Sequence, residues 1–122
     1  MGKKILVIGS LNTDMVIPVK ELPQKGETIL GGSPAHIPGG KGANQACAAG
    51  KLGGAVTMLG KVGQDEMGRA LKENLAAAGV EVTHVEETPD APTGMAVIYV
   101  GETGSNSIVV IPGANGLCDA AF

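Results

Sequence analysis

Apolar and polar positions divide most of the chain into segments of strand and helix type. Residues 4–9 and 56–62 are almost continuously apolar, the pattern of strands buried on both faces of a sheet. Residues 40–53 follow a glycine turn and carry mostly small side chains, and the apolar residues of 67–78 recur at helical intervals. A further strand is expected over 80–85. This order of strand, helix, strand, helix and strand predicts an α/β fold with a parallel sheet and flanking helices.

The ends of the second helix carry clear signals. Asp65 is a good N-cap, and Glu66 lies favourably in the first turn, where the helix dipole stabilises negative charge. Gly79 stands where a helix usually ends in a left-handed residue. Capping therefore explains Asp65 and Glu66 better than catalysis does.

Four short segments interrupt the order of strands and helices. Two follow the first buried strand, and the other two are joined by GETGSN, a glycine-containing connection suited to a hairpin. We expect these segments to form a small separate sheet, a lid, over one end of the parallel sheet. They span 15–19, 27–30, 95–100 and 107–111. Residues 1–122 then form part of one domain, with lid strands inserted at about 15–38 and 93–112.

Composition narrows the classes of function. The chain has 122 residues, enough for one domain, and 43% of them are hydrophobic. The nine basic residues are scattered and the net charge is -3, whereas a nucleic-acid surface needs a basic stripe. No apolar run approaches the roughly eighteen residues that cross a membrane. We therefore expect neither nucleic acid nor a membrane as a partner.

Cysteine and histidine give no sign of a metal site. Cys47 and Cys118 are isolated, without metal spacing or a paired framework, which is typical of a reduced, cytoplasmic protein. His36 and His84 lie far apart and have no metal partner at a useful spacing. We expect no metal ligands in this chain.

The first candidate site is GSLNTD, directly after the first buried strand. Ligands of open α/β sheets bind beyond the carboxyl ends of the strands. Asn12 and Asp14 place an amide and a carboxylate there, two residues apart. A carboxylate can accept hydrogen bonds from neighbouring hydroxyls and an amide can both donate and accept, which suits a polyol. The alternative is that both are simply turn residues.

The second candidate is GGKGAN, which opens at Gly39. Gly39, Gly40 and Gly42 let the backbone approach a ligand closely, and the following helix offers free N–H groups to oxygen atoms. Lys41 adds a movable positive charge. The segment fits neither the nucleotide P-loop nor G-x-G-x-x-G. A bare glycine turn is the alternative, but Asn44 is a weak helix former in the first turn, so a side chain pointing into the site would explain it.

Three apolar residues of the second lid hairpin are weaker candidates. Ala96, Ile98 and Ile108 fit either the underside of a cover that faces the ligand or ordinary core packing. Thr93 and Gly94 open this hairpin and fit turn residues.

Together these segments resemble the ribokinase family of sugar kinases. The resemblance runs through ILVIGSLNTDMV, KGETILGG, PGGKGANQACAAGKLGG, VGQDEMGRALKENLAAAGV, TGMAVIYV and IVVIPGAN, and so covers essentially the whole chain. The family's N-terminal signature falls on Gly39, Gly40, Gly42, Asn44, Ala46, Gly53 and Gly63. The resemblance implies a Rossmann-like parallel sheet with flanking helices and a small β-sheet lid, in truncated form.

The resemblance also implies a site. Asn12, Asp14 and the backbone around Gly40 would hydrogen-bond the hydroxyls of D-ribose, with Lys41 and Asn44 on the other side of the ring. The lid would close over the sugar and pair with a second subunit to make a homodimer. In such enzymes the 5-hydroxyl of ribose attacks the γ-phosphate of ATP, with Mg²⁺ and a monovalent cation such as K⁺ present.

One departure from the family pattern is large. The family's catalytic base is the aspartate of a GAGD motif, and this sequence contains no GAGD. We expect the parent to be an ATP-dependent kinase that phosphorylates D-ribose at O5. This chain is expected to be its N-terminal portion, with no catalytic residue of its own, no activity alone and a missing C-terminal portion as its partner. The alternatives are a non-catalytic sugar-binding or lid-dimerising protein, and a kinase for another pentose such as deoxyribose.

Overall fold

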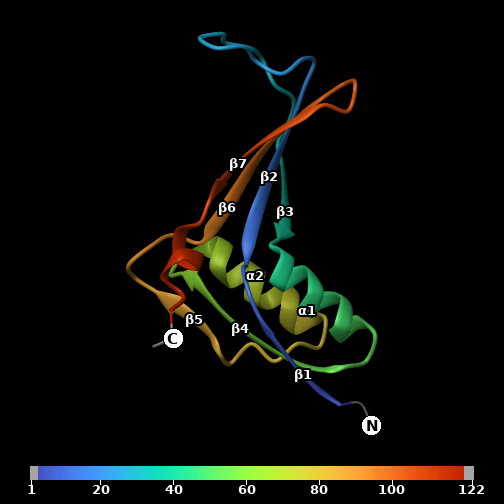
Figure 1. The fold of residues 1–122 in the computed structure, drawn as a ribbon, viewed down its shortest axis with the longest axis vertical. Helices are drawn as coiled ribbons and strands as arrows, with labels where there is room; N and C mark the ends of the chain where they lie inside the picture. Colours follow the sequence, from blue (N-terminus) through green and yellow to red (C-terminus); the bar gives the residue numbers. More distant parts are fainter. Residues whose placement is uncertain (1–2, 120–122) are drawn as a thin grey trace.

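The computed structural model describes residues 3–119 and divides its strands between two sheets. The first contains β1 (Lys4–Ile8), β4 (Ala55–Gly63) and β5 (Val85–Thr88), all parallel and in the order β1-β4-β5. Helices α1 (Lys41–Lys51) and α2 (Glu66–Ala77) pack on one face of this sheet (Figure 1). We call this part the α/β unit.

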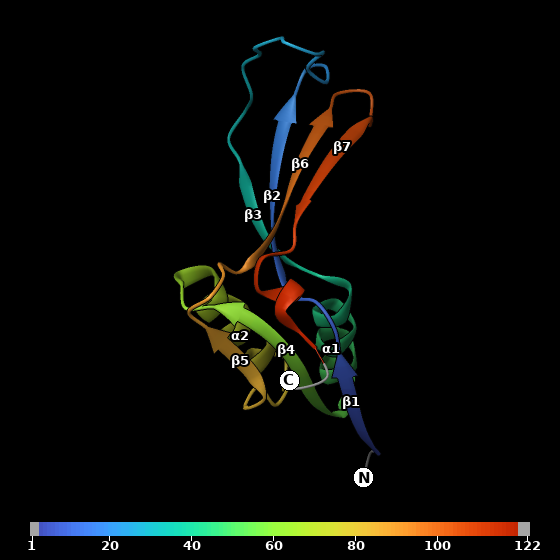
Figure 2. The same cartoon turned by 60° about the vertical axis from the view of Figure 1, so that its left-hand side comes forward.

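The second sheet is the lid. It contains β2 (Asn12–Val19), β3 (Ala35–Gly39), β6 (Gly94–Gly101) and β7 (Asn106–Ile111) in the order β3-β2-β6-β7. The central pair β2 and β6 is parallel and both outer pairs are antiparallel. Figure 2 shows the lid as an arm that rises from one end of the α/β unit. The 3-10 turn η1 (Gly113–Leu117) then returns the chain to that unit. The predicted fold class, a parallel α/β sheet with a small second sheet, is confirmed.

Apolar side chains from β4 and the two helices form the buried core. Met58 and Val62 alternate along β4 and point to the same face. Leu71 and Leu75 of α2 pack against this face, as their spacing of four predicts. The small side chain of Ala46 is fully buried and lets α1 lie close to the sheet. The same cluster contains Leu11, Ala43, Val56, Ala78, Val80 and Val85.

Asp65 joins the lid to the start of α2. Its Oδ1 accepts a hydrogen bond from the Gly68 N–H at 2.8 Å, which confirms the predicted N-cap. Thr93, the residue before β6, donates its hydroxyl to the same Oδ1 at 2.6 Å and its N–H to Oδ2 at 3.0 Å. The Thr93 hydroxyl also accepts from the Gly63 N–H at 2.9 Å. Thr93 is therefore more than a turn residue, because it fixes the base of the lid.

The strand predicted at 27–30 is wrong. The structure gives these residues no strand, and only Gly31 bridges back to Val19. The fourth lid strand is instead β3, whose sequence AHIPG has no continuous apolar pattern. Pro38 is tolerated because β3 lies at the edge of the sheet, where one side of the strand needs no partner.

The strand predicted over 80–85 begins too early. Glu81 makes a single bridge to Thr57, after which the chain leaves the sheet and returns as β5 at Val85, opposite Gly60. Val80 and Val85 are both buried in the core, which explains their apolar character without one continuous strand.

β1 differs from its predicted burial on both faces. Ile5, Leu6 and Ile8 are 40%, 59% and 67% exposed. β1 is the edge strand of the described sheet, and both helices pack on the opposite face from Leu6 and Ile8. An apolar edge strand with an uncovered face is therefore a feature of residues 3–119.

β2 begins at Asn12, earlier than the predicted start at residue 15, because Asn12, Thr13 and Asp14 already pair with β3 and β6. Asn12 and Asp14 are therefore strand residues and not turn residues. The bounds of α1, β4, β6 and β7 lie close to those predicted. Gly79 has a φ of 85°, in the left-handed region that ends α2, and β6 and β7 form the predicted hairpin. The helix predicted after Asp119 lies outside the described residues. Within residues 3–119, no helix combines the length and the apolar character needed to span a membrane.

Candidate functional site

A polar cluster lies where the chain passes from the α/β unit into the lid. Asn12 and Asp14 begin β2 and, being two residues apart, point to the same face of the lid. Asn12 pairs with Gly39 of β3 and with Gly94 of β6. Both neighbours of Asn12 are thus glycines, which leave space around its amide.

The carboxylate of Asp14 lies directly over Gly39. A Cβ atom added at Gly39 would stand 2.5 Å from Oδ2 and 2.6 Å from Oδ1 of Asp14. These distances are far below ordinary contact, so only glycine at position 39 leaves the carboxylate in its place. The glycine predicted to admit a ligand admits the Asp14 side chain.

Gly40 brings the start of α1 against the turn between β1 and β2. Its φ is 94°, a conformation that L side chains rarely adopt, and a Cβ here would lie 2.5 Å from the carbonyl oxygen of Ser10. The Ala43 N–H donates to that same oxygen at 3.0 Å. Lys41 and Gly42 open the helix, so their N–H groups have no acceptor within it. The positive end of α1 therefore lies beside Asn12 and Asp14.

Burial raises the pKa of the Asp14 carboxyl above its ordinary value. Within residues 3–119 the structure gives this carboxylate no hydrogen-bond donor. A half-buried carboxylate without protein donors can accept hydrogen bonds from the hydroxyl groups of a ligand.

Lys41 and Asn44 lie in the first turn of α1 with exposed side chains. The backbone N–H of Asn44 donates to the Gly40 carbonyl at 2.8 Å. The structure describes no contact between either side chain and Asn12 or Asp14. It thus brings together Asn12, Asp14, Gly39, Gly40 and the buried Gly42, and places Lys41 and Asn44 on the helix beside them.

Apolar residues make up most of the lid face that carries Asn12 and Asp14. Asp14 pairs with Ala96, and Ile98 pairs with Ile108, so these side chains share one face. Ala96 is 5% exposed, whereas Ile108 is 54% exposed. Ala96 is packed at the base of the lid, and Ile108 is open to the surroundings further along it.

Asn115 belongs to this cluster and was not predicted from the sequence. Its Oδ1 accepts from the Leu11 N–H at 3.0 Å. Its Nδ2 donates to the Leu11 carbonyl at 3.0 Å and to Asn12 Oδ1 at 2.7 Å. The contact joins residues more than a hundred positions apart, and the only local signal is the turn-forming PGAN segment.

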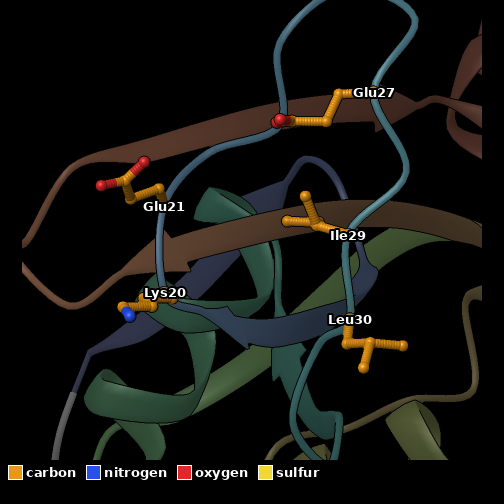
Figure 3. A pocket seen from close by; sticks show the side chains of 5 residues that line it. All are labelled: Lys20, Glu21, Glu27, Ile29 and Leu30. Atoms are coloured by element: carbon orange, nitrogen blue, oxygen red, sulfur yellow. The ribbon is translucent and has the colours of Figure 1, made fainter.

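Other features of the described chain lie elsewhere. Figure 3 shows a hollow at the far end of β2, with Lys20 and Glu21 on one side and Glu27, Ile29 and Leu30 across from them. Cys47 and Cys118 are free thiols. In the part of the chain that the structure covers, no three His, Cys, Asp or Glu side chains gather into a metal-binding group.

Fold and site together define a class. A parallel α/β unit meets a lid sheet at a polar cluster beside a glycine-lined helix start, and ligands of open α/β sheets bind beyond the carboxyl ends of the strands. The sequence model for "pfkB family carbohydrate kinase" matches residues 2–120. The chain belongs to the pfkB family of carbohydrate kinases.

Two curated relatives show where the chain stands in this family. It is 49% identical to the ribokinase of Bacillus subtilis over 93% of this chain and 38% of that protein. It is 43% identical to the deoxyribokinase of Salmonella typhimurium over 91% of this chain and 36% of that protein. The chain therefore spans little more than a third of the length of these relatives.

Solved structures show the same similarity and the same coverage. The structure of ribokinase from Giardia lamblia matches with a TM-score of 0.89 and 40% identity, over 99% of this chain and 36% of that one. Arabidopsis thaliana ribokinase complexed with ribose and ATP matches with a TM-score of 0.85 and 37% identity, over 94% of this chain and 38% of that one. These matches place the fold of residues 3–119 among ribokinases.

Proposed function

We propose that the polar cluster of Asn12, Asp14 and Gly40 binds D-ribose, as the sugar-binding portion of a ribokinase. The complete protein would phosphorylate D-ribose at O5 using ATP. The observation that carries this proposal is the Asp14 carboxylate, half-buried beside the start of α1 without a protein donor. The ribose complex of the similar Arabidopsis protein supports the choice of sugar.

The chemistry of the cluster suits a polyol. Sugar hydroxyls can donate to the Asp14 carboxylate and accept from Asn12 and from the free N–H groups at the start of α1. Gly39, Gly40 and Gly42 have no side chains, so the sugar could come close to the backbone there. The side chains of Lys41 and Asn44 would reach the sugar from the first turn of α1.

The apolar lid face would contribute a cover. Ala96, Ile98 and Ile108 share the face of Asp14 and can pack over the carbon atoms of the sugar. A lid closed in this way excludes water from the phosphoryl transfer, which otherwise competes with the sugar hydroxyl. The same lid would pair with that of a second subunit in a homodimer.

The proposed reaction also needs a phosphoryl donor and cations. ATP would supply the phosphoryl group, Mg²⁺ would neutralise its charge, and K⁺ would act as the monovalent cation. The described residues offer no three-ligand cluster for a metal ion. Their part in the reaction is to bind and orient the sugar.

An ADP-release assay with D-ribose, Mg-ATP and potassium tests this division of roles. We expect no turnover by the chain alone. We expect ribose-dependent turnover when the chain replaces the matching 38% of the Bacillus relative. Turnover by the chain alone that is lost in Asp14→Ala would show a complete phosphoryl-transfer site within these residues. A folded chimera that binds ATP but ignores ribose would contradict the proposal.

A second candidate substrate is 2-deoxyribose, favoured by the 43% identity to a deoxyribokinase. A site built to hydrogen-bond a hydroxyl discriminates strongly against a sugar that lacks it, because polar groups are then left unpaired. Comparing the affinities of the chain for ribose and 2-deoxyribose separates the two. Tighter binding of 2-deoxyribose would favour the second candidate.

A further inference from the structure

Asn115 lies in η1, where the chain returns from the lid, and its side chain contacts that of Asn12. All three hydrogen bonds of its side chain go to Leu11 and Asn12. These are the residues that lead from β1 into β2. Asn115 therefore holds the strand that carries the proposed sugar ligands.

The backbone of Leu11 fixes the orientation of the Asn115 side-chain amide. A backbone N–H can only donate and a carbonyl can only accept. Asn115 must therefore turn Oδ1 to the Leu11 N–H and Nδ2 to the Leu11 carbonyl. The second proton of this Nδ2 points to Asn12, which has to present Oδ1, since two facing NH₂ groups would repel each other.

The orientation of Asn12 follows from that contact. Its Oδ1 is held at 2.7 Å by Asn115, so Nδ2 is the end that remains for a ligand. Among residues 3–119 the structure gives this Nδ2 no acceptor, and it leaves no fully buried side-chain nitrogen or oxygen unpaired. The Asn12 Nδ2 is therefore accessible.

Gly94 supplies an independent sign that this pair of amides is built into the fold. A Cβ at position 94 would collide with Asn115 Nδ2 and would lie 2.5 Å from Asn12 Oδ1. The carbonyl oxygen of Pro112 would be 2.8 Å away. Glycine at the first position of β6 therefore makes room for the contact between Asn12 and Asn115.

We propose that Asn115 is a positioning residue of the sugar site, which turns Asn12 so that its N–H, and not its carbonyl, meets an oxygen of the sugar. This inference rests on the proposed function. The oriented donor complements Asp14, which only accepts when ionised. Together the two side chains match a pair of neighbouring hydroxyls, one of which donates while the other accepts.

The substitution Asn115→Asp tests the orientation in the full chain. It keeps an acceptor for the Leu11 N–H but removes the NH₂ group, so Asn12 must turn over to donate to the new carboxylate. Proton NMR reports the orientation of the Asn12 side chain through nuclear Overhauser effects between its Nδ2 protons and the α protons of Gly94. These should be weak in the native chain and strong in Asn115→Asp. Strong effects in the native chain would overturn the inference.

Ribose affinity tests whether Asn115 acts through Asn12. We expect Asn115→Asp to weaken binding about fivefold to tenfold, the loss of roughly one hydrogen bond, and by less than about twofold in an Asn12→Ala background. Asn74→Asp, with the same change on the exposed side of α2, should have no effect. An equal loss with and without Asn12 would mean that Asn115 acts only on the fold.

The two readouts separate the two proposals. Absence of ribose binding by the native chain would count against the proposed function. The amide orientation would still be decided by the Overhauser effects, because that measurement needs no sugar.

Discussion

At the scale of single residues, the candidate site depends on the absence of a Cβ atom at Gly39. Gly39 has an ordinary φ, so an alanine there would not strain the backbone. Its effect would be confined to the Asp14 carboxylate, whose oxygens lie 2.5 and 2.6 Å from the position of the new Cβ. The position of the Asp14 carboxylate therefore depends on glycine at position 39.

We therefore expect Gly39→Ala to cost ribose affinity rather than the fold. The displaced carboxylate should weaken binding about tenfold or more, in the range of lost charge-assisted hydrogen bonds. Circular dichroism and calorimetric titration with ribose measure the two effects. Gly116→Ala is the control, because a Cβ atom at Gly116 would meet only Pro112 Cβ, at 3.8 Å. Gly26→Ala is unsuitable, because Gly26 has a φ of 76° and an alanine there would be strained. Equal affinity in Gly39→Ala and native chains would show that Asp14 does not hold the sugar.

The raised pKa of Asp14 predicts a pH dependence in both stability and binding. Because burial raises the pKa of the folded carboxyl, its ionisation costs folding stability. That cost is absent below the unfolded-state pKa and is complete above the folded-state pKa. Ribose needs the ionised form as acceptor, so affinity should fall as pH drops through the raised pKa. Asp14→Asn should lose this pH dependence of affinity in calorimetric titrations at a series of pH values that begins at the ordinary pKa of an aspartate and rises above it. An unchanged dependence in the variant would assign it to another group.

At this scale the sequence predicts the candidate site residues but not all of the residues that contact them. Asn12, Asp14 and the glycine turn follow from local patterns of polarity and spacing. Asn115 does not, because its hydrogen bonds reach Leu11 and Asn12 across most of the chain. A short segment such as PGAN gives no hint of a partner that only the fold brings near.

At the scale of elements, Asp65 and Thr93 connect the lid to the α/β unit. Burial opposes the charge of Asp65, but hydrogen bonds from Thr93 and Gly68, together with the charge of Arg69, outweigh it and hold the pKa below its ordinary value. A depressed pKa means that Asp65 stabilises the fold above its unfolded-state pKa, and that this stability is lost as pH falls through the folded-state pKa.

Thr93→Val should loosen this connection. The change keeps the shape of the side chain but leaves the buried Gly63 N–H without its acceptor and removes a donor to Asp65. We expect a loss of about 1–3 kcal/mol in denaturant unfolding, and faster amide exchange along β6. Thr103→Val in the exposed turn between β6 and β7 should change little. If both variants unfold alike, the contact with Asp65 contributes nothing to the lid.

Elements with a strong internal pattern were predictable, and elements defined by their neighbours were not. The α2 periodicity and the β6–β7 hairpin carry their own signals, whereas β3 contains Pro38 and Gly39 and is a strand only because β2 lies beside it. The early start given to β5 has the same origin, since Val80 is buried in the core although the strand itself begins only at Val85. Burial alone does not tell a strand from a turn that fills the core.

At the scale of the whole molecule, an α/β unit and a lid meet at one polar cluster (Figure 2). The cluster draws on both parts: Asn12 and Asp14 begin a lid strand, and Gly40 and Lys41 begin a helix of the α/β unit. Movement of the lid would therefore move one half of the site against the other.

The most direct test of the central claim is the affinity of this chain for D-ribose, measured by titration calorimetry for native, Asp14→Asn and Glu21→Gln chains. Glu21 is an exposed carboxylate at the far end of the lid and serves as the matched control. We predict that the native and Glu21→Gln chains bind alike and that Asp14→Asn binds about tenfold more weakly or worse. Equal binding by all three chains, or none by the native chain, would contradict a sugar site built around Asp14.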